Sequence, residues 1–302
     1  MSMSRNFTVG IVGGGAVGLA YAALLSEVTK VIVKTRRQDQ ADRIQADGIS
    51  LTIEGTPEQA SGVDASPDAV TLAACDAVLI TVKSYDTTQV TEEISSALKP
   101  DAVVVSLQNG MQALPILRAN LVNPARVFGG VTYVGATRKD ENGVTLGNNR
   151  RTVIDYNASI LVDVIGKSRF GVEASPDISQ AIWDKMVLNT GQNALGAITD
   201  LTLGEMLESE HCLEVAEKLL AEFQAVAKAE GITFDYSPME KLRDNWKNST
   251  FHPSMWQDLQ RGNKTEIDAI NGAISELGVK HKVPTPYNDM VVSLVKVAES
   301  RS

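Results

Sequence analysis

The sequence predicts an α/β doubly wound domain at the N-terminal end, followed by an all-α C-terminal domain, and three observations support this. Short β-branched runs alternate with Ala-rich stretches in the first half, which is typical of parallel βαβ units. A glycine-rich segment joins the first run to the first helix. Beyond Pro176 the pattern becomes long and helical. We therefore predict domains at residues 1–174 and 175–302, packed directly against each other with a ligand cleft between them.

Each expected element follows from local hydrophobic patterning. The expected strands of the first domain are FTVGIVG (7–13), VIVK (31–34), DAVLITVK (76–83), DAVVVSL (101–107) and ARVFGGVTYVG (125–135), with a first helix at AVGLAYAALLSEV (16–28). The expected helices of the second domain are residues 177–198, 212–231 and 265–283, the last of which is ended by Pro284.

Composition narrows the functional class. The 302 residues are 43% hydrophobic and 22% charged, which suits a globular protein with a substantial core. A net charge of −9 argues against general binding to nucleic acid or anionic membranes. No apolar run approaches the roughly 20 residues of a membrane span, so we expect a soluble, cytoplasmic protein. Two cysteines and three distant histidines predict neither a disulfide framework nor a metal site.

The most informative motif is a GxGxxG segment formed by Gly13, Gly15 and Gly18 between the first strand and the first helix. The first glycine permits a tight turn, the second lets a pyrophosphate approach the backbone, and the third lets the helix pack on the strand. The helix N-terminus adds free N–H donors for phosphate groups. This context predicts a Rossmann-type dinucleotide site, with a Gly-rich structural turn as the alternative.

The end of the second expected strand indicates which dinucleotide binds. NAD-binding units usually carry Asp or Glu there, but this chain has Lys34, Thr35, Arg36 and Arg37. A guanidinium can grip a ribose 2′-phosphate with two hydrogen bonds, so NADPH is favoured over NADH. A solvated basic turn is the alternative.

Two later strands end in polar residues at the sheet edge where ligands bind. Lys83 ends one, and Asn109 with Gly110 follows the other. The Asn-Gly pair is equally consistent with a plain turn.

The first long helix of the second domain carries Lys185, Asn189 and Asn193 at four-residue intervals, which aligns them on one face. The flanking positions are apolar, so this stripe either meets partners, lines a polar cleft or faces water. Farther along, Ser254 and Asp258 precede Glu266. We place Glu266 as a half-buried acid on the expected helix at residues 265–283.

Together these motifs resemble the ketopantoate reductases (2-dehydropantoate 2-reductases). The likeness spans residues 9–272, and its most specific parts are the WxKxxxNxxxN helix and SMxQD followed by TEIDAING. The resemblance implies NADPH as hydride donor and reduction of a 2-oxo acid to a 2-hydroxy acid, with pantoate, a coenzyme A precursor, as the best-known product.

Carried over by position, the resemblance implies roles for residues of both domains. Lys185 would be the general acid, with Glu266 beside both substrate and cofactor. Asn189 and Asn193 would contact the substrate hydroxyl, Ser254 its carboxylate, and Asn109 both the substrate and the nicotinamide ribose. The remaining cofactor contacts would come from the glycine-rich segment and three other positions, namely Gly13, Gly14, Gly15, Ala16, Val17, Gly18, Arg36, Lys83 and Ala136.

Two departures concern the substrate. Phe251 and Leu203 stand where some members of the family carry polar contacts. Their apolar side chains leave open a reductase of a different 2-oxo acid, and a third alternative is a non-catalytic NADP(H)-binding regulator. Lys185 with Glu266 favours an enzyme, since a regulator needs no proton donor. No motif reports the oligomeric state, so a homodimer is neither predicted nor excluded.

Overall fold

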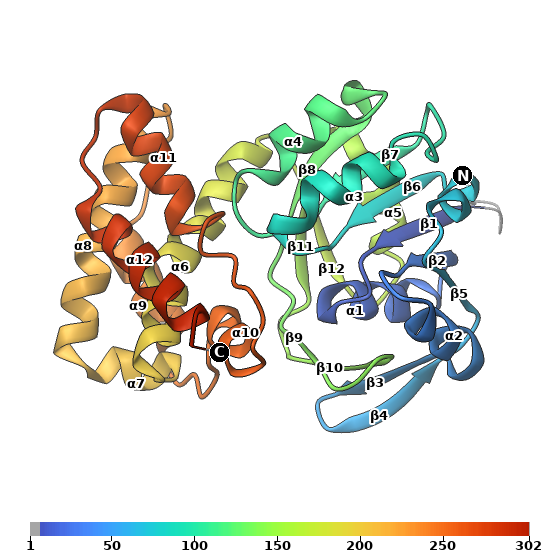
Figure 1. The fold of residues 1–302 in the computed structure, drawn as a ribbon, viewed down its shortest axis with the longest axis horizontal. Helices are drawn as coiled ribbons and strands as arrows, with labels where there is room; N and C mark the ends of the chain where they lie inside the picture. Colours follow the sequence, from blue (N-terminus) through green and yellow to red (C-terminus); the bar gives the residue numbers. More distant parts are fainter. Residues whose placement is uncertain (1–6, 302) are drawn as a thin grey trace. The chain divides into compact units, whose positions relative to one another are not determined.

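The computed structural model describes residues 7–301, and these form two compact units (Figure 1). Unit 1 contains the chain up to Gln108 together with Ala113–Ser179. Unit 2 contains Asn109–Gln112 and the chain from Gln180 onward. The four-residue segment Asn109–Gln112 therefore belongs to the helical unit, although the strand that ends at Ser106 just before it belongs to the α/β unit.

Unit 1 is built on an eight-stranded sheet in the order β12-β11-β8-β7-β6-β1-β2-β5. Its strands are β1 (Thr8–Val12), β2 (Lys30–Lys34), β5 (Val63–Ser66), β6 (Ala77–Ile80), β7 (Val103–Ser106), β8 (Val127–Thr132), β11 (Arg151–Asp155) and β12 (Gly171–Ser175). Its helices are α1 (Ala16–Leu25), α2 (Gln38–Asp47), α3 (Thr87–Ile94), α4 (Ala113–Asn120) and α5 (Ser159–Ile165), with short 3₁₀ turns at Ala69–Ala74, Ser84–Asp86, Pro124–Arg126 and Tyr156–Ala158.

The sheet is mixed rather than wholly parallel. β11 runs antiparallel to β8, whereas the other neighbouring pairs are parallel. The chain passes from β8 to β11 through a strand hairpin and not through a crossover helix, and an antiparallel return needs no such helix. The α/β class predicted from the sequence is confirmed, and the parallel βαβ units are accompanied by one antiparallel pair.

A second sheet of four strands, in the order β4-β3-β10-β9, was not predicted. It consists of β3 (Ile49–Ile53), β4 (Thr56–Ala60), β9 (Ala136–Arg138) and β10 (Gly143–Leu146). Helix α1 packs against strands of both sheets, and its residues 18–25 are all buried (Figure 1). This double covering explains why α1 is apolar around its whole circumference.

Unit 2 is helical, as predicted. It comprises α6 (Ile178–Thr199) from Gln180 onward, α7 (Leu203–Glu208), α8 (Glu210–Ala229), α9 (Pro238–Trp246), α10 (Ser254–Gln260), α11 (Asn271–His281) and α12 (Pro286–Glu299). One placement was wrong, because α11 begins at Asn271 and Glu266 lies in the turn before it. The carbonyl of Glu266 accepts from the amides of Ala269 and Ile270, which builds a tight turn ahead of the helix.

Candidate functional site

The glycine-rich segment has the local geometry that a bound dinucleotide requires. Gly13 has φ of +117°, a conformation that favours glycine, and its amide donates to the carbonyl of Lys34 over 3.0 Å. A Cβ at Gly18 would stand 1.8 Å from the carbonyl oxygen of Gly13, so only glycine lets α1 start this close to the loop. Gly13 and Gly18 therefore pack closely against other protein atoms.

Gly15 differs from these two, because a Cβ built there meets no atom within 4 Å. It is the N-cap of α1, where backbone N–H groups point outward without helical acceptors. Open space before a helix N-terminus is what a pyrophosphate would fill, since phosphate accepts from such donors. The residues present therefore fit a dinucleotide at this loop.

The end of β2 is strongly basic, and its four polar residues have different environments. Lys34 is buried and pairs with Glu93. Lys34 first, and Arg36 more weakly, hold the pKa of Glu93 below its usual range. Arg36 is exposed beside them, and Thr35 donates from Oγ1 to the carbonyl of Arg37 over 2.9 Å.

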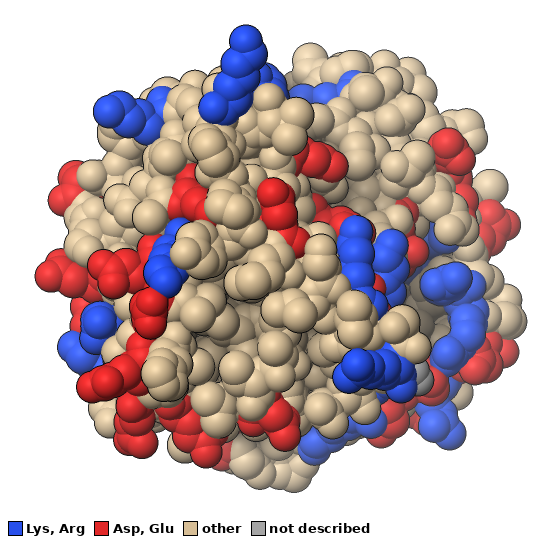
Figure 2. Space-filling model, turned by 60° about the vertical axis from the view of Figure 1, so that its left-hand side comes forward, with Lys and Arg blue, Asp and Glu red and all other residues tan. Residues whose placement is uncertain are grey.

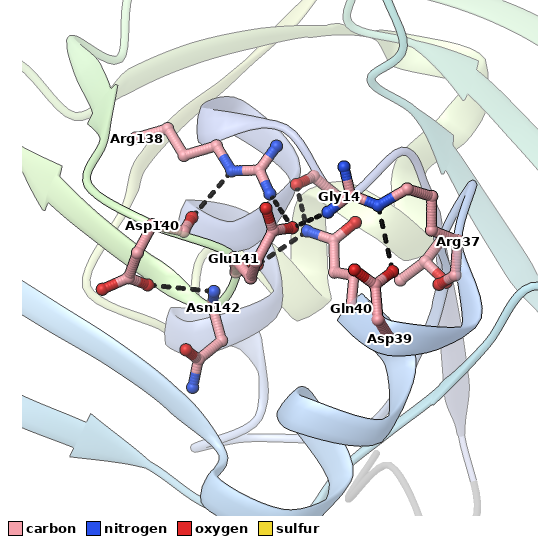
Figure 3. Close-up of polar contacts among 9 residues, drawn as sticks. Gly14, Arg37, Asp39, Gln40, Arg138, Asp140, Glu141 and Asn142 are labelled. Carbon is pink, nitrogen blue, oxygen red and sulfur yellow. Dashed lines mark hydrogen bonds and ion pairs between the residues drawn. The ribbon is translucent and has the colours of Figure 1, made fainter.

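Arg37 and the β9–β10 hairpin form a polar network that sequence reasoning missed (Figure 3). Glu141, at the hairpin turn, contacts the guanidinium groups of both Arg37 and Arg138. Gln40 of α2 donates to the carbonyl of Gly14 over 2.8 Å and to that of Glu141 over 2.7 Å. The hairpin is thereby tied to the glycine-rich loop. Gln40 and Glu141 are 101 residues apart, and no local pattern predicted their contact.

Two other predicted cofactor positions lie in unit 1. Lys83 follows β6 by three residues and is the N-cap of the 3₁₀ turn Ser84–Asp86. Gln108 supports this turn, because its Nε2 donates to the carbonyl of Val82 over 3.0 Å and to Oγ1 of Thr87 over 2.8 Å. Ala136 begins β9 and, like Ala16 and Val17, packs against the buried apolar cluster of unit 1.

Asn109 lies in unit 2, held by the turn that precedes α11. Gly110, with φ of +87°, packs so closely on that turn that a Cβ would lie 2.5 Å from the carbonyl oxygen of Ala269. The side chain of Asn109 donates from Nδ2 to Oε2 of Glu266 over 3.1 Å. Glu266 is 5% exposed, so it is fully buried and not half-buried as expected. The structure thus brings two predicted site residues into contact.

The stripe on α6 is formed as the spacing predicted. Asn189 and Asn193 are 4% and 3% exposed, which rules out a stripe facing water at these two positions. Nδ2 of Asn189 is buried and has no hydrogen-bond partner among the described residues. An orphaned buried donor is costly to a folded protein unless a ligand pairs with it. This amide therefore suits contact with a polar ligand.

Lys185 occupies the first position of the stripe and has an unusual electrostatic environment. Burial, and secondarily the positive charge of Lys241, lower the pKa of Lys185 to about 8. Lys241 is held by Tyr236, whose hydroxyl accepts from Nζ over 2.9 Å and donates to Asp184 over 2.7 Å. An ammonium with a pKa of about 8 can donate a proton far more readily than an ordinary lysine.

The remaining predicted residues lie around the start of α10. Pro253 packs against α6, since a Cβ at Gly196 would lie 2.4 Å from its ring, and Ser254 follows as the first residue of α10. Phe251 is 69% exposed, while Leu203 is buried and its amide donates to the carbonyl of Phe251 over 3.0 Å. The two departures from the family pattern are therefore neighbours.

The surface offers no continuous basic band on the face drawn in Figure 2, where acidic and basic side chains are intermixed. Within residues 7–301, no helix is long and apolar enough to cross a membrane, and no three His, Cys, Asp or Glu side chains converge as a metal site would need.

Comparison with protein families covers nearly the whole chain. A family model described as ketopantoate reductase PanE/ApbA matches residues 9–159, and its C-terminal counterpart matches residues 177–299. The 2-dehydropantoate 2-reductase of Archaeoglobus fulgidus is 30% identical, with 97% of this chain and 98% of the relative covered. That of Aquifex aeolicus is 28% identical, with 96% of each chain covered.

Solved structures similar to this chain include a member of the same family. The PanE/ApbA family ketopantoate reductase from Ralstonia eutropha has a TM-score of 0.91 and 32% identity, covering 98% of this chain and 99% of its own. D-Mandelate dehydrogenase, solved with NADH and anilino(oxo)acetate, has a TM-score of 0.88 over 98% of this chain and 99% of its own. Its identity of 23% supports a shared fold alone.

Proposed function

This chain belongs to the ketopantoate reductase family, and from that premise we propose that it reduces 2-dehydropantoate to pantoate with NADPH. Pantoate is a precursor in pantothenate and coenzyme A biosynthesis. The observation that carries the proposal is the α6 stripe, in which an ammonium of lowered pKa is followed by an unpaired, buried amide donor. A 2-oxo acid with a hydroxyl group offers a partner to each.

The glycine-rich loop, Arg36 and Lys83 would hold the pyrophosphate and adenosine half of NADPH, with Ala136 near the nicotinamide half. When bound, NADPH supplies the hydride. The open space at Gly15 and the basic end of β2 support this assignment, since both suit phosphate groups.

Lys185 would act as the general acid. Reduction of a ketone leaves negative charge on its oxygen, and a positioned ammonium stabilises that charge and then donates its proton. The pKa near 8 makes the transfer easier than it is for an unperturbed lysine. Asn189 and Asn193 would hold the substrate hydroxyl, and Ser254 its carboxylate.

Asn109 and Glu266 form a hydrogen-bonded pair that would contact both ligands. The amide fixes the orientation of the buried carboxylate, whose negative charge would favour the protonated form of a nearby amine. This pair would position the substrate rather than transfer the proton itself.

Oxidation of NADPH, followed by absorbance, tests the proposal. We expect 2-dehydropantoate to be reduced with the highest kcat/KM in a panel of 2-oxo acids, with NADH as the weaker donor. Absence of NADPH oxidation with every 2-oxo acid would instead favour the non-catalytic regulator, provided that NADPH still binds.

A second candidate is the reduction of a 2-oxo acid with a more apolar side chain. The observation in its favour is the exposed aromatic side chain of Phe251, three residues before Ser254. An apolar residue there lacks a hydrogen bond that would discriminate in favour of a hydroxylated substrate. The variant Phe251→Asn separates the two candidates, because it should raise the kcat/KM for 2-dehydropantoate relative to 2-oxo acids with aliphatic side chains only if Phe251 sets the preference.

We also propose a cytoplasmic location, in keeping with a biosynthetic role. A relative from Staphylococcus aureus, 23% identical, is described as a dimeric ketopantoate reductase, and sedimentation analysis would establish the oligomeric state of this chain.

A further inference from the structure

Two arginines from separate elements of unit 1 converge on a single carboxylate. Arg37 follows β2, and Arg138 ends β9. Both contact Oε2 of Glu141, with 2.5 Å between that atom and Nη2 of Arg138 (Figure 3). Arg37 also donates from Nε to Asp39 over 3.0 Å. A pair of guanidinium groups aimed at one anionic oxygen is the arrangement by which proteins bind phosphate.

The location of this cluster matches one part of the dinucleotide. In doubly wound folds the adenosine ribose lies beyond the C-terminal end of the second strand, which is Lys34 here, three residues before Arg37. Gln40 links the carbonyls of Gly14 and Glu141, so the cluster is one side chain away from the glycine-rich loop. A group on the 2′ position of the adenosine ribose would therefore lie beside Arg37 and Arg138.

Glu141 occupies the anion position of this cluster. Its carboxylate is 37% exposed, so water and ligands reach it, whereas its carbonyl is anchored by Gln40. A phosphate dianion and a carboxylate cannot both take the same donors without strong repulsion. The side chain of Glu141 can rotate away from the two arginines, while the bond from Gln40 to its carbonyl keeps the backbone in place.

We propose that Arg37 and Arg138 form a clamp for the 2′-phosphate of NADP(H) and that Glu141 is the internal anion that this phosphate displaces. Glu141 thereby limits the affinity for the phosphorylated dinucleotide. The inference rests on the proposed use of NADPH and adds to Arg36 two arginines and a competing carboxylate. It is independent of which 2-oxo acid is reduced.

The test measures nucleotide binding to the full chain by titration calorimetry. The probes are adenosine 2′,5′-bisphosphate, which carries the 2′-phosphate, and adenosine 5′-monophosphate, which lacks it. Glu141→Gln keeps the size of the side chain and the Gln40 contact, which uses the main chain, but removes the charge. We expect it to bind the bisphosphate about tenfold more tightly, and the monophosphate within about twofold of wild type.

Arg138→Ala should weaken bisphosphate binding about tenfold and leave the monophosphate unaffected. The matched control is Glu173→Gln, since Glu173 also pairs with an arginine, Arg151, in an exposed ion pair of the same unit. We expect no change in either affinity for this variant. Thermal unfolding of each variant verifies that it is folded.

Several results would overturn the inference. One is an unchanged or weaker affinity of Glu141→Gln for the bisphosphate. Another is a selective loss of monophosphate binding in that variant, which would mean that Glu141 accepts from a ribose 2′-hydroxyl and serves NADH. A wild-type chain that binds neither probe would also overturn the dinucleotide assignment. Failure to reduce 2-dehydropantoate leaves all of these measurements intact, because neither probe contains nicotinamide or a 2-oxo acid.

Discussion

Asn109 donates to the buried carboxylate of Glu266 over 3.1 Å, although 157 residues separate the two in the sequence. Both lie in unit 2, because Asn109–Gln112 leaves the α/β unit and packs on the turn before α11. The positive φ of Gly110 permits this close approach. The Asn-Gly pair therefore bends the chain and also directs the Asn109 side chain to Glu266, while its contact with a ligand stays a prediction.

Replacing Asn109 with Ala removes the amide donor and leaves Glu266 buried without it. We expect kcat/KM for the 2-oxo acid to fall roughly 10- to 100-fold, since the loss of a hydrogen bond to a charged group costs about 1–3 kcal/mol. The control is Gln112→Ala, which removes an exposed hydrogen bond of 2.8 Å to Glu276 from the same segment. This control should retain activity within about twofold. Equal losses in the two variants would mean that only the packing of the segment matters.

The pH profile should reveal the general acid. Lys185 must be protonated to donate, and burial lowers its pKa to about 8. The rate of ketone reduction should therefore be level below pH 8 and fall with rising pH above it, while the reverse oxidation rises. We expect Lys185→Ala to lower kcat about 100-fold or more and to abolish this limb, with NADPH affinity nearly intact. Measurement of kcat from pH 6 to pH 10 for both proteins tests whether Lys185 is the general acid.

Lys241 supplies a second test of the same assignment. Its positive charge is the lesser cause of the lowered pKa of Lys185, after burial. Lys241→Met removes that charge, so the falling limb of the reduction profile should move to higher pH. Lys247→Met is the control, because Lys247 is exposed and pairs with Asp244. A profile of Lys241→Met that coincides with wild type would exclude Lys185, with this environment, as the titrating group.

Much of the fold follows from local patterning, and the failures have physical causes. Helix α6 was predicted because its 22 residues give a long apolar pattern with a clear end. The small sheet was missed because β9 has only 3 residues, and because the β3–β10 pairing joins segments more than 90 residues apart. Glu266 was placed on a helix because Ile267, Ile270 and Ile274 have helical spacing, yet a turn buries the first two.

The candidate site likewise contains residues that local patterns predicted and residues that they did not. The glycine-rich loop and the stripe of Lys185, Asn189 and Asn193 are contiguous in sequence, so spacing alone predicted them. Glu141 gave no such signal, because it stands in a charged hairpin turn that resembles any solvated loop. Its significance comes from Arg37 and Gln40, which are about 100 residues away. Contacts of that range depend on the topology, which local patterns do not encode.

The unpaired amide of Asn189 predicts opposite effects on stability and function. Asn189→Leu removes a buried donor that has no partner among the described residues, so the free energy of unfolding should stay the same or rise by about 1 kcal/mol. The kcat/KM for a hydroxylated 2-oxo acid should fall at least about tenfold, because the substrate loses a hydrogen bond.

Asn271→Leu provides the comparison for this variant. Asn271 is equally buried, but its Nδ2 donates to the carbonyl of Thr190 over 3.1 Å and to Asn288 over 3.0 Å. Its loss should lower the free energy of unfolding by about 1–3 kcal/mol. Urea denaturation of both variants gives the two values. A large destabilisation by Asn189→Leu would show that the amide has a structural role.

Gly15 and Gly18 should respond differently to the same added methyl group. Gly18→Ala places a Cβ 1.8 Å from the carbonyl oxygen of Gly13, so the loop or α1 must shift, and we expect a loss of more than about 3 kcal/mol in the free energy of unfolding. Gly15→Ala meets no atom within 4 Å and has an extended backbone, so its stability should change by less than about 1 kcal/mol. Its methyl group would instead occupy the space assigned to the pyrophosphate, and NADPH affinity should fall at least about tenfold. Thermal unfolding and fluorescence titration with NADPH measure the two effects, and undiminished NADPH binding by Gly15→Ala would show that the pyrophosphate lies elsewhere.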